Sequence, residues 1–388
     1  MSNVWHVGVN ALLLTTDDTY RSAGVSTYIG QLLQELPPAA PDFTWTAFVT
    51  NRLDPPPVGF GVARPGWATD SPWARIVWEQ TGLALAARQR RLDLLHGTVY
   101  ANPLLAPCRT VVTVHDLSFV HFPTTVRRFN RFYLRAVTRL AARRAVRVIA
   151  DSESTRRELL AWLGLSAAKV VTVPIAADER FRPAAADAVD AFRRQRGLPA
   201  RFALFLGTLE PRKNLVRLLD AYAVCRTRLA EDLPLVIAGS RGWYYDEIFA
   251  RVRRLDLQDA VHFAGFVPAA ELPWWYRAAD IFVYPSLYEG FGLPVLEAMA
   301  SGTAVITSNT SSLPEVAGDA AILVDPSDVE ALAEALVRVL NDPELRLAMS
   351  VAGVRQAAKF SWRRCAEETV AVYHEALGLS GPTPQVPA

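Results

Sequence analysis

The sequence predicts an α/β protein with two doubly wound domains, and three features of the 388-residue chain support this prediction. Short apolar segments of strand length alternate with longer amphipathic segments of helix length, as in parallel sheets covered by helices. Two such series occur, separated by residues 173–183, which contain two Pro residues and little periodicity. A chain of this length exceeds one ordinary core and accommodates two.

The apolar segments define the strands that we expect in each domain. In the first series they are residues 7–14, 44–49, 94–96, 110–115 and 147–150. In the second series they are residues 203–207, 234–238, 261–264, 281–284 and 304–306. Residues 54–70 are rich in Pro and Gly and are expected to form a long loop.

These segments set the predicted domain boundaries. The first domain is residues 1–176, and the second is residues 177–360. Ser361 is the expected N-cap of a final helix at residues 361–377. Residues 378–388 are rich in Gly and Pro and are expected to form a disordered tail.

Composition excludes several classes of protein. The 41 basic and 39 acidic residues give a net charge of +2, without the basic excess of a dedicated nucleic-acid-binding protein. Cys108, Cys225 and Cys365 are odd in number and widely spaced, so we expect no disulfide framework, no metal cluster and a reducing compartment. The first residues lack the features of a signal peptide, and no apolar run reaches the roughly 18–20 residues that span a bilayer. We therefore expect a cytoplasmic protein, peripheral to a membrane at most.

The segment from Glu289 to Glu297 carries the strongest functional signal. Two carboxylates flank a Gly-rich turn, and Pro294 suits the first turn of the helix that follows. The free N–H groups at such a helix start favour an anion such as phosphate, while the carboxylates can accept bonds from hydroxyl groups. Any one of these residues alone is more often structural, because Glu near a helix N-terminus is common. The whole pattern is typical of a site for a sugar nucleotide.

Other chemically able residues follow predicted strands, where ligands of open α/β sheets bind. Arg212 and Lys213 are adjacent cations that suit a diphosphate. Gly24 would let the backbone approach a phosphate, and His115 follows residues 110–114. Taken singly, each has a structural alternative: a solvated turn for Arg212 and Lys213, a simple turn for Gly24, and a hydrogen-bonded residue for His115.

Motifs of several other ligand sites are absent from the sequence. It contains no Asp-x-Asp, a motif with which many enzymes that use sugar nucleotides hold a divalent metal. It also contains no P-loop and no Gly-x-Gly-x-x-Gly, which argues against a kinase or a dehydrogenase. We therefore expect no cofactor and no metal, with cations and helix N-termini neutralising a diphosphate instead.

The spacing of Glu289 and Glu297 resembles the E-x7-E signature of retaining GT-B glycosyltransferases of the GT4-like group. Segments 207–214, 238–243 and 303–306 are similar to the donor-binding half of that family. Segments 22–25 and 114–117 are similar to its acceptor half, so the resemblance covers nearly the whole chain. The local setting is similar to bacterial O-antigen and exopolysaccharide mannosyltransferases. Two positions depart from the pattern: Thr208 stands where many relatives have Arg, and Ala23 where they have Gly.

The resemblance implies a GT-B fold, in which two Rossmann-like domains face a central cleft, and it implies roles for ten residues. The implied catalytic residues are His115, Arg212, Lys213 and Glu289. The implied donor-binding residues are Gly24, Gly207, Phe291, Gly292, Leu293 and Glu297. The implied partners are a nucleotide-diphosphate sugar and a glycan or lipid-diphosphate-linked acceptor, and no metal is implied.

Two other functions stay open at the level of sequence. A GT-B-fold sugar-nucleotide epimerase would need no separate acceptor. A non-catalytic sugar-nucleotide-binding partner of another transferase is the second, although Arg212, Lys213, Glu289 and Glu297 argue against it. Turnover of a panel of nucleotide sugars, with and without acceptors, separates these functions from transfer.

An Arg-rich segment at residues 126–147 suggests a further partner. On a helix, Arg128, Arg131, Arg135, Arg139 and Arg143 would share one broad face, with aromatic residues near its start. Such a face can lie on an anionic membrane. The alternative is a solvated helix whose apolar side packs on the first domain.

Overall fold

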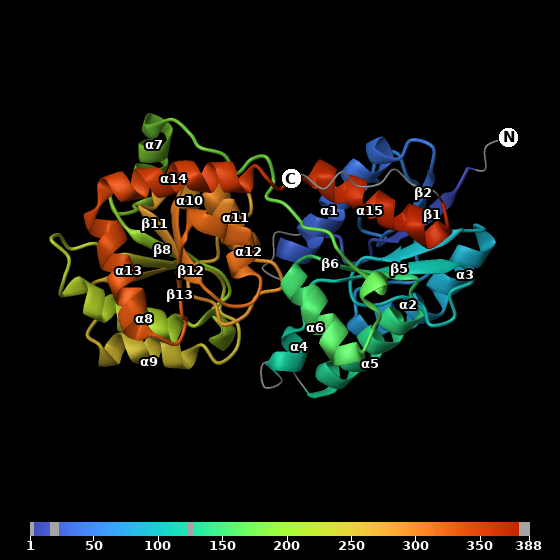
Figure 1. Ribbon diagram of the computed structural model, residues 1–388, viewed down its shortest axis with the longest axis horizontal. Coiled ribbons are helices and arrows are strands. Elements are labelled where there is room, and N and C mark those ends of the chain that lie inside the picture. Colours follow the sequence, from blue (N-terminus) through green and yellow to red (C-terminus); the bar gives the residue numbers. More distant parts are fainter. Residues whose placement is uncertain (1–3, 16–22, 123–127, 380–388) are drawn as a thin grey trace. The chain divides into compact units, whose positions relative to one another are not determined.

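The computed structural model describes residues 4–15, 23–122 and 128–379, and its chain divides into two compact units (Figure 1). The first unit comprises Met1–Ile175 together with Ser361–Ala388, and the second comprises Ala176–Phe360. Each unit contains one sheet, and all the strand pairs of the described residues are parallel. The predicted α/β class is therefore confirmed.

The sheet of the first unit has seven strands in the order β3-β2-β1-β4-β5-β6-β7. They are β1 (His6–Asn10), β2 (Thr44–Phe48), β3 (Gly61–Ala63), β4 (Leu94–Gly97), β5 (Arg109–Val114), β6 (Arg147–Ala150) and β7 (Val170–Thr172). The helices of this unit are α1 (Ala23–Ala39), α2 (Pro72–Gln80), α3 (Gly82–Gln89), α4 (Ser118–His121), α5 (Arg128–Arg144), α6 (Glu153–Leu163) and α15 (Trp362–Leu377). The strand order reverses between β1 and β4, which places a topological switch point there.

The final helix α15 belongs to the first unit, although almost two hundred residues separate it from the rest of that unit. Ser361 caps it by accepting a hydrogen bond from the N–H of Arg364 at 3.2 Å, so the predicted N-cap is confirmed. α15 packs against α1 (Figure 1). Its Tyr373 hydroxyl bonds to Nδ1 of the buried His96 at 2.6 Å, and His96 Nε2 bonds to Thr113 at 2.8 Å. Helix and sheet are thus joined by buried hydrogen bonds as well as by apolar contacts.

The sheet of the second unit has six strands in the order β10-β9-β8-β11-β12-β13. They are β8 (Ala203–Leu206), β9 (Leu235–Ala238), β10 (Val261–Gly265), β11 (Ile281–Tyr284), β12 (Ala304–Ser308) and β13 (Ile322–Val324). The helices are α7 (Ala186–Arg196), α8 (Leu215–Arg226), α9 (Asp246–Arg254), α10 (Leu272–Ala278), α11 (Leu293–Ala300), α12 (Leu313–Ala317), α13 (Val329–Asn341) and α14 (Pro343–Ala357). Here the order reverses between β8 and β11.

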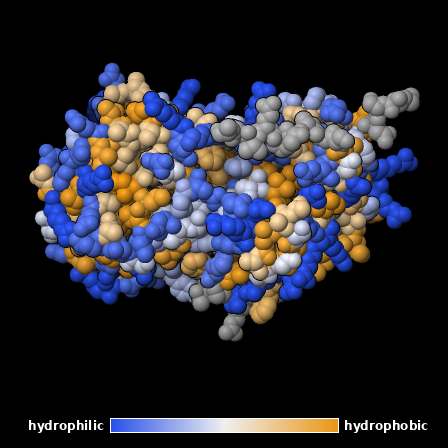
Figure 2. Space-filling view, in the orientation of Figure 1, coloured by the Kyte–Doolittle hydropathy of each residue, from blue (hydrophilic) through white to orange (hydrophobic). Residues whose placement is uncertain are grey.

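Burial explains why the strands read as continuous apolar runs. All four residues of β4, β9 and β11 are buried, as expected of strands covered by helices on both faces. The surface is mixed: on the face shown in Figure 2, hydrophobic residues form scattered patches among hydrophilic ones. Each unit therefore has its hydrophobic core around its sheet, and the side chains that could bind a ligand lie at the ends of the strands.

Two predictions about elements were wrong in detail. Residues 54–70 are not only a loop, because β3 lies within them; this edge strand has only three residues, and its first residue is Gly61. The strand predicted at residues 7–14 ends at Asn10, where the chain leaves the sheet. Most of the predicted tail, residues 380–388, lies outside the described residues.

Helix α5 turns a different face outward from the one predicted. Arg131 and Arg135 are half-buried, and the Arg135 guanidinium lies 5.9 Å from the centroid of the Trp162 ring. The outward side carries Phe132 at 71% exposure, Leu140 at 41%, and the exposed Arg139 and Arg143. The start of the predicted segment, residues 126–127, lies outside the described residues, as does the side chain of Arg128. The exposed stripe is therefore apolar and basic together.

Candidate active site

The best-developed candidate site lies at the switch point of the second unit. Strands β8 and β11 pair directly, and each is followed by a loop at its carboxyl end. The loop after β8 contains Gly207, whose N–H bonds to the carbonyl of Ala238 at 3.0 Å, and then a short 3₁₀ turn, Pro211–Lys213. The loop after β11 contains Glu289. The fold thus brings together residues that lie 76 positions apart, in the crevice where ligands of open α/β sheets bind.

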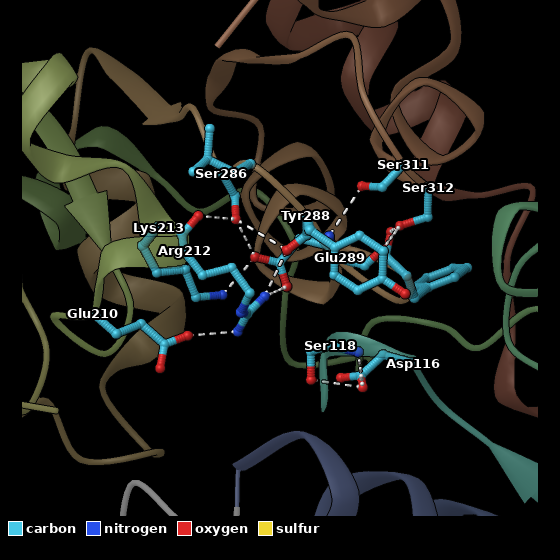
Figure 3. Close-up of polar contacts among 12 residues, drawn as sticks. Asp116, Ser118, Glu210, Arg212, Lys213, Ser286, Tyr288, Glu289, Ser311 and Ser312 are labelled. Atoms are coloured by element: carbon cyan, nitrogen blue, oxygen red, sulfur yellow. Dashed lines mark hydrogen bonds and ion pairs between the residues drawn. The ribbon is translucent and has the colours of Figure 1, made fainter. Parts of the chain in front are cut away.

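The carboxylate of Glu289 pairs with both predicted cations (Figure 3). Its Oε2 lies 2.8 Å from a guanidinium nitrogen of Arg212, and its Oε1 lies 2.6 Å from Nζ of Lys213. Arg212 is half-buried, whereas Glu289 and Lys213 are buried. Buried charges need partners of this kind, because removing an ion from water is costly.

Neutral donors and a second carboxylate complete the cluster. Tyr284 and Ser286 donate hydrogen bonds to Oε1 of Glu289 at 3.0 and 2.6 Å. Arg212 also pairs with Glu210 at 2.7 Å and donates to the carbonyl of Tyr288 at 2.6 Å (Figure 3). The formal charges of the two cations and the two carboxylates cancel, so the cluster has no net formal charge when no ligand is bound.

The cluster holds Glu289 ionised. Burial alone would raise the pKa of Glu289, but Arg212 and Lys213, together with the bonds from Lys213 and Ser286, lower it to about 2. Burial and the neighbouring Arg212 lower the pKa of Lys213 from its usual value, and the Glu289 carboxylate opposes that shift. Glu289 is thus a charged group at neutral pH, fixed in position by several donors.

The turn after Glu289 is shaped by Gly292 and by two Ser residues in the loop that follows β12. Gly292 has φ of +111°, and a Cβ atom there would lie 2.8 Å from a methyl group of Leu313, so Gly is required. Ser311 accepts a bond from the N–H of Glu289 at 3.0 Å. Ser312 donates to the carbonyls of Glu289 and Phe291 at 2.9 and 2.7 Å. These contacts fix the entry into α11.

Helix α11 starts at Leu293, with Pro294 in its first turn as predicted. The ring of Phe291 is buried against Phe360, with the ring centroids 5.8 Å apart. The first N–H groups of a helix have no partner within it, and they carry partial positive charge. The start of α11 is therefore able to bind an anion beside the cluster of Glu289.

Glu297 lies one turn into α11 and has a different environment. It accepts a hydrogen bond from the hydroxyl of Tyr276 at 2.9 Å. Burial raises the pKa of Glu297 to about 7, against the smaller lowering effects of Tyr276 and Arg180. The two carboxylates of the predicted motif are therefore distinct: Glu289 is charged at all ordinary pH values, and Glu297 titrates near neutrality.

His115 lies in the first unit, after β5. Its Nδ1 bonds to Asp151 at 2.7 Å, and its Nε2 bonds to the carbonyl of Thr98 at 2.9 Å. Both partners are acceptors, so both ring nitrogens carry hydrogen. Burial alone would lower the pKa of His115, but Asp151 raises it above its usual value. His115 is thus a protonated, oriented ring, which cannot accept a proton while these two bonds last.

The other predicted positions of the first unit are simpler. The carboxylate of Asp116, within the segment 114–117, accepts from the N–H and the hydroxyl of Ser118, the first residue of α4, at 3.0 and 2.9 Å. Gly24 is the second residue of α1 and not a loop residue, and a Cβ atom there would have no atom of the described residues within 4 Å. Ser22 lies outside the described residues.

Sequence reasoning missed several residues that hold these groups in place. Tyr284 and Ser286 stand in the strand and loop just before Glu289, so their position was an available signal. Nothing in the spacing of Ser311, Ser312 or Tyr276 indicates that they bind this segment. Asp151, the partner of His115, also gave no signal, because 36 residues separate the two.

Two broader features concern ligands and membranes. Within residues 4–15, 23–122 and 128–379 no group of three or more His, Cys, Asp or Glu side chains is arranged to hold a metal ion. In the same part of the chain no helix is both long and apolar enough to cross a bilayer.

Two family models match the chain, one in each half. Residues 22–181 match the model of Glycosyltransferase Family 4, and residues 189–356 match that of Glycosyl transferases group 1. The chain is 35% identical over 291 residues to O-antigen chain mannosyltransferase B of Escherichia coli, an alignment that spans 75% of this chain and 76% of the relative. The chain belongs to the group 1, family 4 glycosyltransferases. It therefore transfers a sugar from a nucleotide sugar.

Further relatives and solved structures agree. The chain is 30% identical to serotype-specific mannosyltransferase WbdA of Escherichia coli but spans only 35% of its length. The sucrose-phosphate synthase of Thermosynechococcus elongatus has a TM-score of 0.77 at 22% identity, covering 96% of this chain and 99% of its own. Anabaena HepE in complex with UDP and glucose has a TM-score of 0.72 at 19% identity, covering 96% and 99%. These likenesses show the GT-B fold.

Proposed function

We propose that this glycosyltransferase moves mannose from a nucleotide-diphosphate sugar to a glycan or lipid-linked acceptor, with retention of anomeric configuration. The observation that carries the proposal is the paired Arg212, Lys213 and Glu289 at the switch point of the second unit, beside the start of α11. The similarity to an O-antigen chain mannosyltransferase supports mannose as the sugar.

The cluster suggests how a diphosphate would be received. Arg212 and Lys213 stabilise the charge that builds up on the leaving diphosphate, and the N–H groups at the start of α11 add partial positive charge. Because Glu289 pairs with both cations, it orients them before the donor arrives. An anion that binds near Arg212 competes with this carboxylate, which frees Glu289 to bind a sugar hydroxyl.

Retention follows from a single-face displacement. The bond between the anomeric carbon and the diphosphate oxygen breaks, and the acceptor oxygen forms a bond to that carbon on the same face. The acceptor's proton passes to the leaving phosphate, so no protein base is needed. His115, whose ring nitrogens both carry hydrogen, fits a positioning role better than that of a base.

The remaining predicted residues bind parts of the donor. Glu297 accepts bonds from the ribose hydroxyls, and the backbone of Phe291–Leu293 binds the sugar and the phosphates. Gly207 and Gly24 let the backbone approach the phosphates, and no metal takes part in this account.

The decisive experiment incubates the protein with radiolabelled GDP-mannose, UDP-glucose and UDP-galactose, with and without oligosaccharide or lipid-linked acceptors, in the presence of EDTA. We expect labelled product only when acceptor is present, and NMR of the product should show retention. Arg212→Ala should lower turnover on the order of 10²- to 10³-fold, because a stabiliser of transition-state charge is lost. Arg226→Ala, on the far end of α8, is the matched control and should leave turnover unchanged.

Other outcomes have definite meanings. Isomerisation of the nucleotide sugar without acceptor would indicate an epimerase, and binding without turnover would indicate a sugar-nucleotide-binding partner. Strict dependence on added Mg²⁺ or Mn²⁺ would contradict the proposed neutralisation by Arg212 and Lys213. Inversion at the anomeric carbon would contradict the single-face displacement.

The exposed stripe of α5 supports an anionic membrane as a second partner. Phe132 and Leu140 project with Arg139 and Arg143 on one side of this helix. Apolar groups that enter the interface and cations that meet anionic headgroups are the two contributions to peripheral binding. Such binding would bring the first unit to an acceptor carried on a lipid.

A further inference from the structure

The loop after β9 presents two large aromatic side chains that the proposed chemistry does not use. Trp243 is 40% exposed and Tyr244 is 67% exposed, whereas most aromatic residues of the second unit are buried. Both follow the carboxyl end of β9, the same edge of the sheet that carries the Glu289 cluster. Exposed aromatic groups at a ligand-binding edge are candidates for recognition.

The loop is fixed to the loop that carries Arg212. The N–H of Leu209 bonds to the carbonyl of Ser240 at 2.9 Å, and the N–H of Gly242 bonds to the carbonyl of Leu209 at 3.1 Å. A Cβ atom at Gly242 would lie 2.9 Å from the Leu209 carbonyl oxygen and 2.7 Å from a methyl group of Thr208. Gly242 thus permits an approach that a larger residue would prevent, and Leu209 is only three residues from Arg212.

Side-chain packing makes the base of this loop rigid. The Arg241 guanidinium lies over the rings of Tyr245 and Phe249, at 5.4 and 5.0 Å from their centroids. Tyr245 and Phe249 in turn pack edge to face, 6.0 Å apart. The backbone that carries the two exposed rings is therefore held by packing on its C-terminal side, which lowers the entropy cost of ordering this loop when a ligand binds.

The backbone at Tyr244 is strained. Its φ is +56°, a left-handed conformation that is uncommon for residues other than Gly, Asn and Asp. Such strain is destabilising and is concentrated at functional sites such as active sites and ligand-binding sites. Folding alone gives no reason to hold a bulky ring in this conformation while most of that ring faces water.

We propose that Trp243 and Tyr244 form a stacking platform for the sugar rings of the acceptor glycan, a subsite on the second unit that adjoins the donor site. One face of a hexopyranose carries several C–H bonds, whose positive edge matches the negative face of an aromatic ring. Tyr and Trp also carry a polar group that can bond to hydroxyls at the rim of the sugar. The inference rests on the proposed transfer to a glycan and names the part of the chain that holds that glycan.

Acceptor length provides the kinetic test. GDP-mannose is used as donor, with α-linked mannotriose or methyl α-mannoside as acceptor. Trp243→Ala and Tyr244→Asn should each raise the KM for mannotriose roughly 5- to 10-fold, and they should change that for methyl α-mannoside less. Asn tolerates the left-handed backbone, so Tyr244→Asn removes the ring without adding strain. Trp243→Phe should restore most of the affinity because it keeps a stacking face.

A binding measurement distinguishes failure of the platform from failure of the proposed function. Saturation-transfer NMR with mannotriose needs no turnover, and the double variant Trp243→Ala with Tyr244→Asn should lose the signal on the sugar C–H protons. Trp67→Ala is the matched control, because Trp67 is a loop residue with 47% exposure in the first unit. Its signal and its acceptor KM should equal those of the wild type.

Three results would overturn the platform. The first is an unchanged saturation-transfer signal in the double variant, and the second is an equal loss in Trp67→Ala. The third is a rise in the KM for GDP-mannose with the acceptor KM unchanged, which would assign the rings to the nucleobase. If no donor is used by the wild type while the signal is lost in the double variant alone, the platform stands and the proposed transfer fails.

Discussion

The carboxylate of Glu289 illustrates how one residue can serve both stability and chemistry. It accepts bonds from two cations of the loop after β8 and from two hydroxyl groups, one at the end of β11 and one in the loop after it. Removing one partner of such a cluster leaves buried charges uncompensated, which costs more than the pair contributes. Activity lost on substitution at Glu289 therefore has to be separated from lost folding.

We expect Glu289→Gln to destabilise the protein in a manner that depends on pH. The pKa of Glu289 is lowered from 4.5 to about 2, so its stabilising contribution is fully present above pH 4.5 and is lost as the pH falls through about 2. Linkage gives a loss on the order of 3 kcal/mol at pH 7. Urea denaturation of wild type and variant should show a gap that narrows between pH 4.5 and the acid limit of folding.

The control for this substitution is Glu330→Gln, which removes an exposed carboxylate paired with Arg228. Exposed ion pairs contribute roughly 0–1 kcal/mol, so this variant should lie close to wild type. A gap for Glu289→Gln that stays constant across the acid range would show that lost packing, and not lost charge, causes the destabilisation.

Glu297 should make donor binding depend on pH near neutrality. Its pKa of about 7 means that the carboxyl is largely uncharged at pH 6 and largely ionised at pH 8. An ionised carboxylate accepts stronger bonds from hydroxyl groups, so the donor KM should fall as the pH rises through 7. Steady-state kinetics of Glu297→Gln should show a higher donor KM with no such step.

The sign of the stability effect at Glu297 is opposite to that at Glu289. Because the folded pKa is raised above 4.5, the unfolded chain loses its proton first, and stability declines as the pH rises from 4.5 through about 7. Glu297→Gln should remove this decline in stability.

The kinetic prediction has its own contradicting outcome. If the donor KM changes around pH 7 in both the wild type and Glu297→Gln, a group other than Glu297 causes the change.

At the scale of elements, the ten predicted strands are all present, because each contains a short apolar run that a sequence shows directly. Most residues of these runs are buried, except in the edge strand β10, where only Val261 is buried. Strands β3, β7 and β13 were not predicted. Each has three residues, and each lies at an end of its sheet. Such strands take their place from the neighbour with which they pair, and a short half-exposed segment carries no periodicity that reveals it.

The candidate site was predictable in its residue types but not in its pairing. The sequence placed Arg212, Lys213 and Glu289 at strand ends, and topology then explains why two of those ends meet. It could not show that Glu289 binds the two cations directly, because that contact depends on how two loops pack. For α5, helical periodicity alone predicted that Arg131 and Arg135 lie on the exposed face. In the structure both are half-buried, and Arg135 lies over the ring of Trp162.

We expect the exposed stripe of α5 to bind anionic vesicles. Replacing Phe132 and Leu140 by Ser should weaken binding at all salt concentrations, because apolar insertion is lost. Replacing Arg139 and Arg143 by Gln should weaken binding mainly at low salt, because surface charge attraction is screened as salt rises. Co-sedimentation with phosphatidylglycerol and phosphatidylcholine vesicles measures both effects.

The matched control is Arg363→Gln, which removes another highly exposed Arg of the first unit, on α15. It should bind as the wild type does. Equal partitioning to neutral and anionic vesicles, or none to either, would contradict the membrane role and favour a soluble acceptor. In each variant, turnover of GDP-mannose with a soluble acceptor should be unchanged.

At the scale of the whole molecule, the second unit is formed by one segment of the chain and the first unit by two. The second unit is one continuous segment with its own sheet and core, Ala176–Phe360. The first unit needs α15 from the end of the chain. That helix buries Trp362 and Tyr373, and the buried His96 bonds to the Tyr373 hydroxyl. The hydrophobic core of the first unit is therefore complete only when α15 is present.

This difference predicts how fragments behave. A fragment of residues 176–360 should fold alone and melt cooperatively, because its core is complete. A fragment of residues 1–175 should fail to melt cooperatively: each large side chain buried by α15 contributes about 1.5–3 kcal/mol, and a domain's total stability is only about 5–15 kcal/mol. Adding a peptide of residues 361–379 should restore a cooperative transition by circular dichroism, and its Tyr373→Phe form should do so less well because His96 loses a buried partner. A cooperative transition of residues 1–175 without the peptide would show that α15 is dispensable for the first unit.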